Sequence, residues 1–154
     1  MIRRQSGQSV YPPAAVHSRL RRLEVSTITK NWASLAQIIG SGDGYVTLSG
    51  TTESFSSDVD METNGYEGAH VIIEMDYDAT PADEVKIKLY GSLDGTNYDD
   101  TPIWEIQGDR TVDPQQLSII VKDLAHFRIG VQQTGSSNSH DVRAYVQPWN
   151  YSSA

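Results

Sequence analysis

The stretch VKIKLYGSLDGTNYDDTPIWEI, residues 85–106, decides the fold class. In its first half the apolar residues Val85, Ile87 and Leu89 alternate with lysines and a tyrosine. The side chains of a strand alternate between its two faces, so this period of two predicts a strand with one buried face. The lysines and the tyrosine are expected to point outward.

The second half of the stretch predicts a turn and then another strand. Asp94-Gly95 is a favoured turn pair, because glycine accepts a positive φ and aspartate tolerates one. Asn97 can hydrogen-bond its own backbone, and Pro102 is typical of a strand entry or a sheet edge. Turn chemistry therefore accounts for this composition, acidic residues included.

Seven other short segments show period-two alternation, more weakly in 54–61, and clusters of Gly, Asp, Asn and Pro separate them. They are 45–49, 54–61, 70–77, 102–107, 116–122, 126–133 and 142–149. Regular short strands with alternating faces are typical of antiparallel sandwiches and barrels. We predict an all-β domain over residues 45–154, an antiparallel β-sandwich that is jelly-roll-like and has about eight strands.

Charge sets the N-terminal part of the chain apart. The first thirty residues hold six basic residues and one acidic residue, whereas the remainder holds six basic and nineteen acidic residues. A basic segment on an acidic body invites an electrostatic partner. We predict a basic N-terminal arm, residues 1–44, that gains its shape from a neighbour. Within it, SLAQII (34–39) fits either a helix or a strand. The expected anchoring contacts are Arg3, Arg4, Arg19, Arg21 and Arg22, with Tyr11, Pro12 and Pro13 stiffening the arm.

Composition argues against several functional classes. The chain has no cysteine, which excludes disulfides, thiolate zinc sites and cysteine nucleophiles. No signal-peptide pattern and no apolar run of membrane-spanning length is visible, so a soluble protein made in a cytoplasm is expected. The chain has no P-loop, no G-x-G-x-x-G and no G-x-S-x-G. We therefore expect no enzyme activity, no cofactor and no metal centre.

Calcium is the alternative to a plain turn after residue 93. Asp94, Asn97, Asp99 and Asp100 supply hard oxygens on one loop, which Ca²⁺ accepts in loose geometry. Their spacing does not match the twelve-residue EF-hand loop, so a turn is the preferred interpretation. The DMETNG segment (60–65) matches only the first half of such a loop, and a strand end with an Asn-Gly turn is preferred there too.

Aromatic residues raise a second alternative, a platform on which sugars stack. The candidates are Trp32, Trp104, Trp149, Tyr90, Tyr98, Tyr145 and Tyr151. Tryptophan and tyrosine are also common in cores and subunit interfaces, and that is the preferred interpretation of these residues.

Two runs carry a resemblance to a known group of proteins. They are GSLDGTNYD (91–99), which ends a strand, and FRIGVQQTG (127–135), in which Phe127, Arg128, Ile129, Val131, Thr134 and Gly135 form the pattern. Over roughly residues 50–150 the chain resembles β-sandwich structural proteins of tailed-bacteriophage virions. The turn in the first run also occurs in carbohydrate-binding and fibronectin-like sandwiches.

The resemblance implies a non-enzymatic virion protein. A capsid decoration (cement) protein is expected, whose arm clamps neighbouring capsid subunits. Its implied partners are the major capsid protein or other virion subunits, and the protein itself is expected to form a dimer or trimer. The alternative is a head-fibre, neck or tail accessory module that binds host-surface carbohydrate. Nucleic acid is an unlikely partner, because the acidic body opposes its approach.

Overall fold

The computed structural model describes residues 28–78 and 80–153, and these residues form eleven strands. The strands are β1 (Ile28–Trp32), β2 (Ala36–Ile39), β3 (Val46–Ser49), β4 (Ser54–Phe55), β5 (Val59–Asp60), β6 (Gly68–Asp76), β7 (Val85–Ser92), β8 (Trp104–Gln107), β9 (Gln115–Lys122), β10 (His126–Gln133) and β11 (Ser139–Ser153). No helix that could cross a membrane occurs among the described residues.

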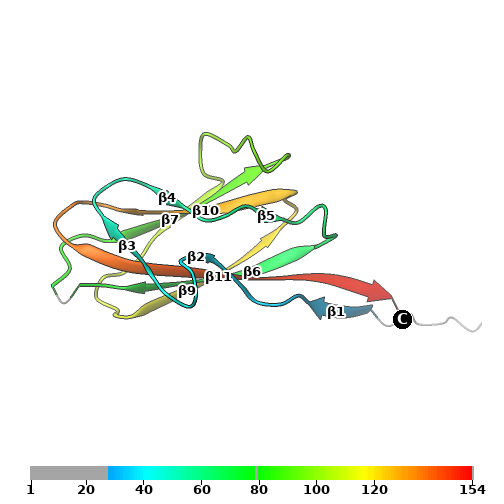
Figure 1. The fold of residues 1–154 in the computed structure, drawn as a ribbon, viewed down its shortest axis with the longest axis horizontal. Helices are drawn as coiled ribbons and strands as arrows, with labels where there is room; N and C mark the ends of the chain where they lie inside the picture. Colours follow the sequence, from blue (N-terminus) through cyan, green and yellow to red (C-terminus); the bar gives the residue numbers. More distant parts are fainter. Residues whose placement is uncertain (1–27, 79, 154) are drawn as a thin grey trace, which may run out of the picture.

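The strands make two antiparallel sheets that face each other (Figure 1). In the six-stranded sheet β1, β2 and β3 follow one another along β11, which is followed by β6 and then β9. In the five-stranded sheet β4 and β5 share one side of β10, which is followed by β7 and then β8. The eleven segments therefore occupy eight strand positions, and the first position lies beside the last strand, as in a jelly roll. The predicted all-β sandwich is confirmed.

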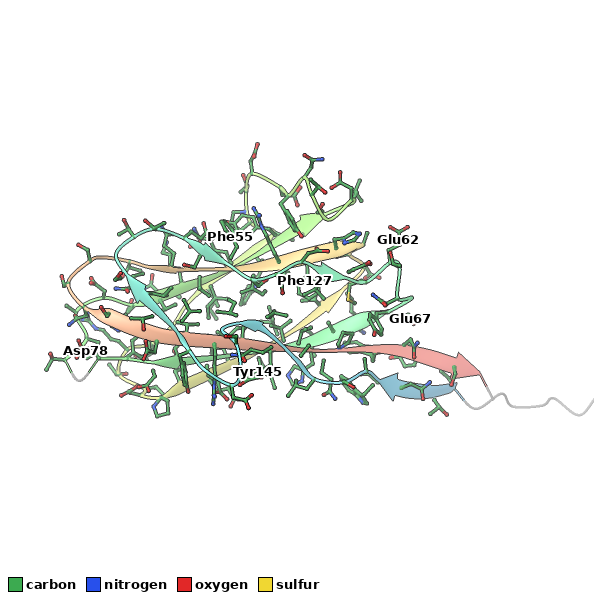
Figure 2. All side chains as sticks on the ribbon, viewed as in Figure 1. Phe55, Glu62, Glu67, Asp78, Phe127 and Tyr145 are labelled. Carbon is green, nitrogen blue, oxygen red and sulfur yellow. The ribbon has the colours of Figure 1, made fainter. Side chains whose placement is uncertain are left out.

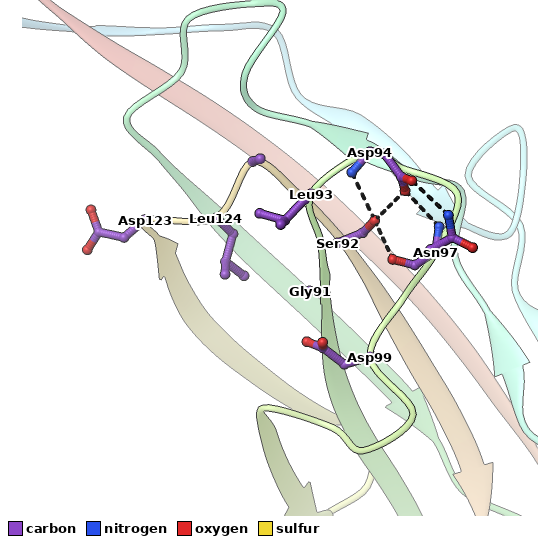
Figure 3. Close-up of a pocket in the computed structure, with 9 residues that line it drawn as sticks. Gly91, Ser92, Leu93, Asp94, Asn97, Asp99, Asp123 and Leu124 are labelled. Atoms are coloured by element: carbon purple, nitrogen blue, oxygen red, sulfur yellow. Dashed lines mark hydrogen bonds between the residues drawn. The ribbon is translucent and has the colours of Figure 1, made fainter.

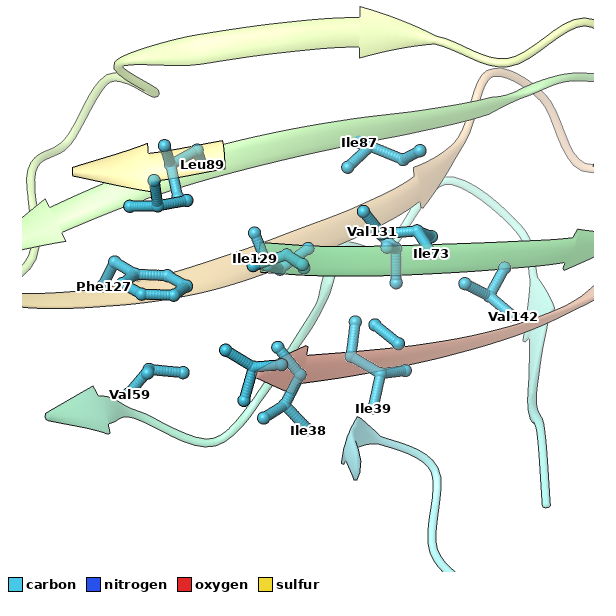
Figure 4. Close-up of a cluster of buried hydrophobic side chains, with 14 of the residues drawn as sticks. Ile38, Ile39, Val59, Ile73, Ile87, Leu89, Phe127, Ile129, Val131 and Val142 are labelled. Carbon is cyan, nitrogen blue, oxygen red and sulfur yellow. The ribbon is translucent and has the colours of Figure 1, made fainter. Parts of the chain in front are cut away.

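The core lies between the inner faces of the two sheets. Val71, Ile73 and Met75 of β6 are fully buried, as are Ile87 of β7 and Ile129 of β10. Figure 4 shows side chains from both sheets meeting in one layer. The alternation that predicted these strands thus gives the buried face, and each such side chain contributes roughly 1.5–3 kcal/mol on burial.

The predicted arm, residues 1–44, is wrong for β1 and β2, which belong to the six-stranded sheet. β2 pairs with β11, and Ile38 and Ile39 are buried in the core. A strand prevails over a helix here because β11 is fifteen residues long and offers hydrogen-bonding groups along this side. The predicted anchoring residues Arg3, Arg4, Tyr11, Pro12, Pro13, Arg19, Arg21 and Arg22 lie outside the described residues.

β1 and the end of β11 form a two-stranded ribbon that projects from the sandwich (Figure 1). All five residues of β1 are exposed. Trp149 fixes the base of the ribbon: it is 1% exposed and packs edge-on against Trp32, with ring centroids 5.1 Å apart. The Nζ of Lys30 lies 3.7 Å from the Trp149 ring centroid. Gly68 makes room for the indole, since a Cβ there would lie 2.1 Å from it.

Candidate functional site

The loop after β7 is held by its own side chains (Figure 3). One carboxylate oxygen of Asp94 accepts hydrogen bonds from the backbone N–H groups of Thr96 and Asn97, at 2.8 and 2.7 Å. The Asn97 side-chain amide donates to the other oxygen at 2.7 Å. These bonds hold the pKa of Asp94 well below its usual range. Together with the positive φ of Gly95, they form the tight turn that the sequence predicts.

The four predicted calcium ligands do not converge. Asp94 is engaged within its own turn, and Figure 3 shows the carboxylate of Asp99 on a separate part of the loop. Asp100 is exposed. Within residues 28–78 and 80–153 no group of three or more His, Asp or Glu side chains is placed to hold a metal ion. Calcium binding at Asp94, Asn97, Asp99 and Asp100 therefore stays a prediction, and the described residues hold no preformed cluster of ligands for it.

A cluster of aromatic and charged side chains covers the outer face of the five-stranded sheet. We call it the Arg128 face, and it comprises Glu53, Phe55, Lys88, Tyr90, Tyr98 and Arg128. Strand alternation sends Phe127 and Ile129 into the core and leaves Arg128 outside. Gly130 leaves room for Glu53, because a Cβ at that position would lie 2.1 Å from the carboxylate.

Arg128 lies between aromatic rings. Its guanidinium carbon is 4.0 Å from the Phe55 ring centroid, 4.1 Å from that of Tyr98 and 5.6 Å from that of Tyr90. Phe55 and Tyr90 pack edge-on, with centroids 5.6 Å apart. The Nε atom is buried, and Arg128 makes no hydrogen bond or salt bridge to any described residue. The rings therefore hold a cation whose donors are not used within the described structure.

The two carboxylates of this region are engaged by other groups. Glu53 accepts hydrogen bonds from the Tyr90 hydroxyl at 3.0 and 3.2 Å and pairs with Lys88 Nζ at 3.2 Å. Burial, followed by the bond to Glu53, raises the pKa of Tyr90 to about 12. Asp58 accepts a hydrogen bond from the Tyr98 hydroxyl and lies 3.0 Å from Nδ1 of His126.

The Asp58 contact makes His126 a more basic residue than an isolated histidine. The hydrogen bond to Asp58 is the main cause that raises the pKa of His126, and the charges of Asp60 and Glu62 add to it. Burial and the same carboxylate raise the pKa of Tyr98. Asp58 therefore links the loop after β7 to β10 beside Arg128.

The outer face of the other sheet carries a second arginine between rings. Arg143 lies 4.5 Å from the Tyr45 ring centroid and 5.6 Å from that of Tyr145. In contrast to Arg128, its Nε donates to Glu74 and one Nη donates to the carbonyl oxygen of Asp43, at 2.8 Å. Figure 2 shows Phe55 and Tyr145 on opposite outer faces, with Phe127 between the sheets.

The aromatic residues considered as one sugar platform separate into groups. Trp32 and Trp149 hold the ribbon, Tyr90 and Tyr98 surround Arg128, and Tyr145 lies near Arg143. Trp104 packs against the core, and Tyr151 is exposed on the ribbon. Arg128 contacts two of these tyrosines, Tyr90 and Tyr98, but it was not predicted from the sequence as a site residue. The sequence signals for it were its outward position in HFRIGVQQ and its place in the FRIGVQQTG pattern.

Comparisons with known proteins give limited guidance. No protein-family model matches the chain, and no curated protein matches it. Among solved structures, the chain is similar to one described as "Bacillus endospore appendages form a novel family of disulfide-linked pili". The two are 12% identical, the match covers 80% of this chain and 88% of that chain, and the TM-score is 0.41. A candidate function therefore rests on this chain's own residues.

Proposed function

We propose that the protein is a non-enzymatic structural component of a virion, of the capsid decoration type. The basic segment would clamp neighbouring capsid subunits, with the major capsid protein as its partner. The protein would act as a dimer or trimer in the assembled virion. This proposal follows the resemblance of GSLDGTNYD and FRIGVQQTG to virion sandwich proteins.

One observation supports the clamp in particular: the chain enters the described fold at the tip of the projecting ribbon. Ile28 pairs with Ser153 there, away from the sandwich (Figure 1). Residues 1–27 precede it and hold five arginines and one acidic residue. A basic segment joined at this point can reach a neighbouring surface without crossing the acidic body. Its contribution would be interface area and ion pairs rather than chemistry.

The test uses shells assembled without the protein from the corresponding capsid protein. The five arginines at 3, 4, 19, 21 and 22 are changed together to glutamine, and occupancy is measured by co-sedimentation at two salt concentrations. The control changes two body cations, Lys86→Gln and Arg110→Gln. We expect the arm variant to lose most of its binding and the control to bind as the wild type does. Full occupancy by the arm variant contradicts the clamp.

A carbohydrate-binding accessory module is the second candidate, and the Arg128 face is the observation that favours it. Phe55 is 44% exposed there, beside a guanidinium and hydrogen-bonding side chains. Exposed rings of this kind stack on the apolar faces of sugars. A binding test on this face does not depend on the arm.

A further inference from the structure

We propose that Arg128, held between Phe55 and Tyr98, binds the carboxylate of an acidic sugar. The inference deepens the second candidate function and is independent of the decoration role. It names the sugar class and the residue that recognises it.

The first step is the state of the guanidinium. Arginine carries five N–H donors and no acceptor. Arg128 uses none of them on a described residue, and its Nε is buried between the rings. Only Nε is buried without a partner, so a carboxylate from outside would meet the Nη groups, which are not among the buried atoms. A carboxylate fits best, because its two oxygens match the fork of the guanidinium.

The second step is pre-organisation. The rings lie 4.0 and 4.1 Å from the guanidinium carbon on β4 and the loop after β7, and these elements are fixed to the sandwich. Tyr98 is tied in turn to Asp58, which also contacts His126 on β10. A side chain held in one orientation loses little conformational entropy when it binds.

The third step separates an acidic sugar from other anions. The carboxylates of Glu53 and Asp58 lie in the same region, and the whole chain carries a net charge of −8. This field opposes polyanions such as nucleic acid and strongly acidic peptides. Glu53 and Asp58 already accept hydrogen bonds from Tyr90 and Tyr98, and the remaining lone pairs of their carboxylates can accept from sugar hydroxyls. A ligand with one carboxylate among many hydroxyls therefore suits the face, and Phe55 offers its exposed ring to the sugar.

The experiment measures binding of two acidic probes, each with a neutral match. Galacturonic acid, with a single carboxylate, is compared with its methyl ester, and 3′-sialyllactose with lactose, so that uronic and sialic acids are distinguished. The variants are Arg128→Gln and Arg128→Lys, and Arg143→Gln is the matched control on the other face. Denaturation midpoints establish that each variant is folded, and isothermal titration calorimetry gives the affinities.

We expect the wild type to prefer at least one acidic probe over its neutral match. Arg128→Gln should weaken that binding about tenfold or more, the lysine variant should lie between, and Arg143→Gln should bind as the wild type does. Three results overturn the proposal: no acidic probe binds, Arg128→Gln binds as well as the wild type, or an Asp/Glu-rich peptide binds through Arg128 in place of the sugars. None of the three bears on the arm, because the shell assay uses different residues.

Discussion

Two arginines, Arg128 and Arg143, lie on opposite outer faces of the sandwich, and each is flanked by aromatic rings. Arg143 also donates to Glu74 and to the carbonyl oxygen of Asp43, so its donors serve the fold. Arg128 has the rings but no acceptor among the described residues. Ring stacking alone therefore does not mark a binding residue. What distinguishes the two is whether the donors are already used.

The largest loss of stability is expected from a variant on the inner face of the five-stranded sheet, compared with one on its outer face. Phe127 is fully buried beneath the Arg128 face, whereas Phe55 is partly exposed upon it. Phe127→Ala should lower the free energy of unfolding by about 3–5 kcal/mol, as expected for a deleted core ring. Phe55→Ala should cost about 1–2.5 kcal/mol, since it removes the edge-on contact with Tyr90 and the cation–π contact with Arg128 from a partly exposed position. Urea denaturation measures both.

Equal losses from the two phenylalanine variants would mean that the Arg128 face is part of the structural core. In that case its rings could not be assigned to a ligand. A variant of Tyr45 on the opposite face, Tyr45→Ala, serves as the matched control for an outer ring beside an arginine.

The second effect compares the arginines directly. Arg143→Gln should lower the denaturation midpoint more than Arg128→Gln does, because it leaves Glu74 without its charged donor. Arg128→Gln should cost no more than about 1 kcal/mol, the usual scale of a cation–π contact near the surface. Thermal denaturation of the single variants, and of the double variant Arg143→Gln with Glu74→Gln, measures these losses of stability. The double variant should lose less stability than the sum of the two single variants. A larger loss of stability for Arg128→Gln than for Arg143→Gln would contradict the distinction between the two arginines.

The smallest effect is a pH dependence centred on His126. The pKa of His126 is raised in the folded protein by Asp58, so protonation stabilises the fold. This contribution is present in full below the unfolded pKa of about 6.5 and is lost as the pH rises through the folded value. Denaturation midpoints between pH 5 and 9 should therefore contain a falling component that His126→Gln lacks. Identical pH profiles for the two proteins would exclude the Asp58 contact as its source.

Local sequence was enough to predict the strands that bury one face. The alternation of Val85, Ile87 and Leu89 predicted the strand and its buried side, and the Asp94-Gly95 pair predicted the turn. Both predictions depend on neighbouring residues only. Residues 36–39 were not predictable in this way. A segment this short, with three apolar residues and Gln37, fits a helix or a strand, and the long strand β11 decides between them.

The candidate site depended still more on distant contacts. An outward arginine in HFRIGVQQ can be predicted, but its neighbours come from β4 and from the loop after β7. The contact between Asp58 and His126 could not be predicted either, because Asp58 lies in a segment, 54–61, whose weak alternation gives little indication of its neighbours. Sequence therefore indicated which way Arg128 points and could not indicate what surrounds it.

The most direct test of the distinction between Arg128 and Arg143 is a ¹⁵N NMR titration that follows the Nε–H signal of each arginine. The buried Nε of Arg128 and the Glu74-bonded Nε of Arg143 are both shielded from rapid exchange, and Arg→Gln variants assign them. With galacturonic acid or 3′-sialyllactose we predict a saturable shift of the Arg128 signal and an unchanged Arg143 signal. Equal shifts at both arginines, or none at Arg128, would contradict the account.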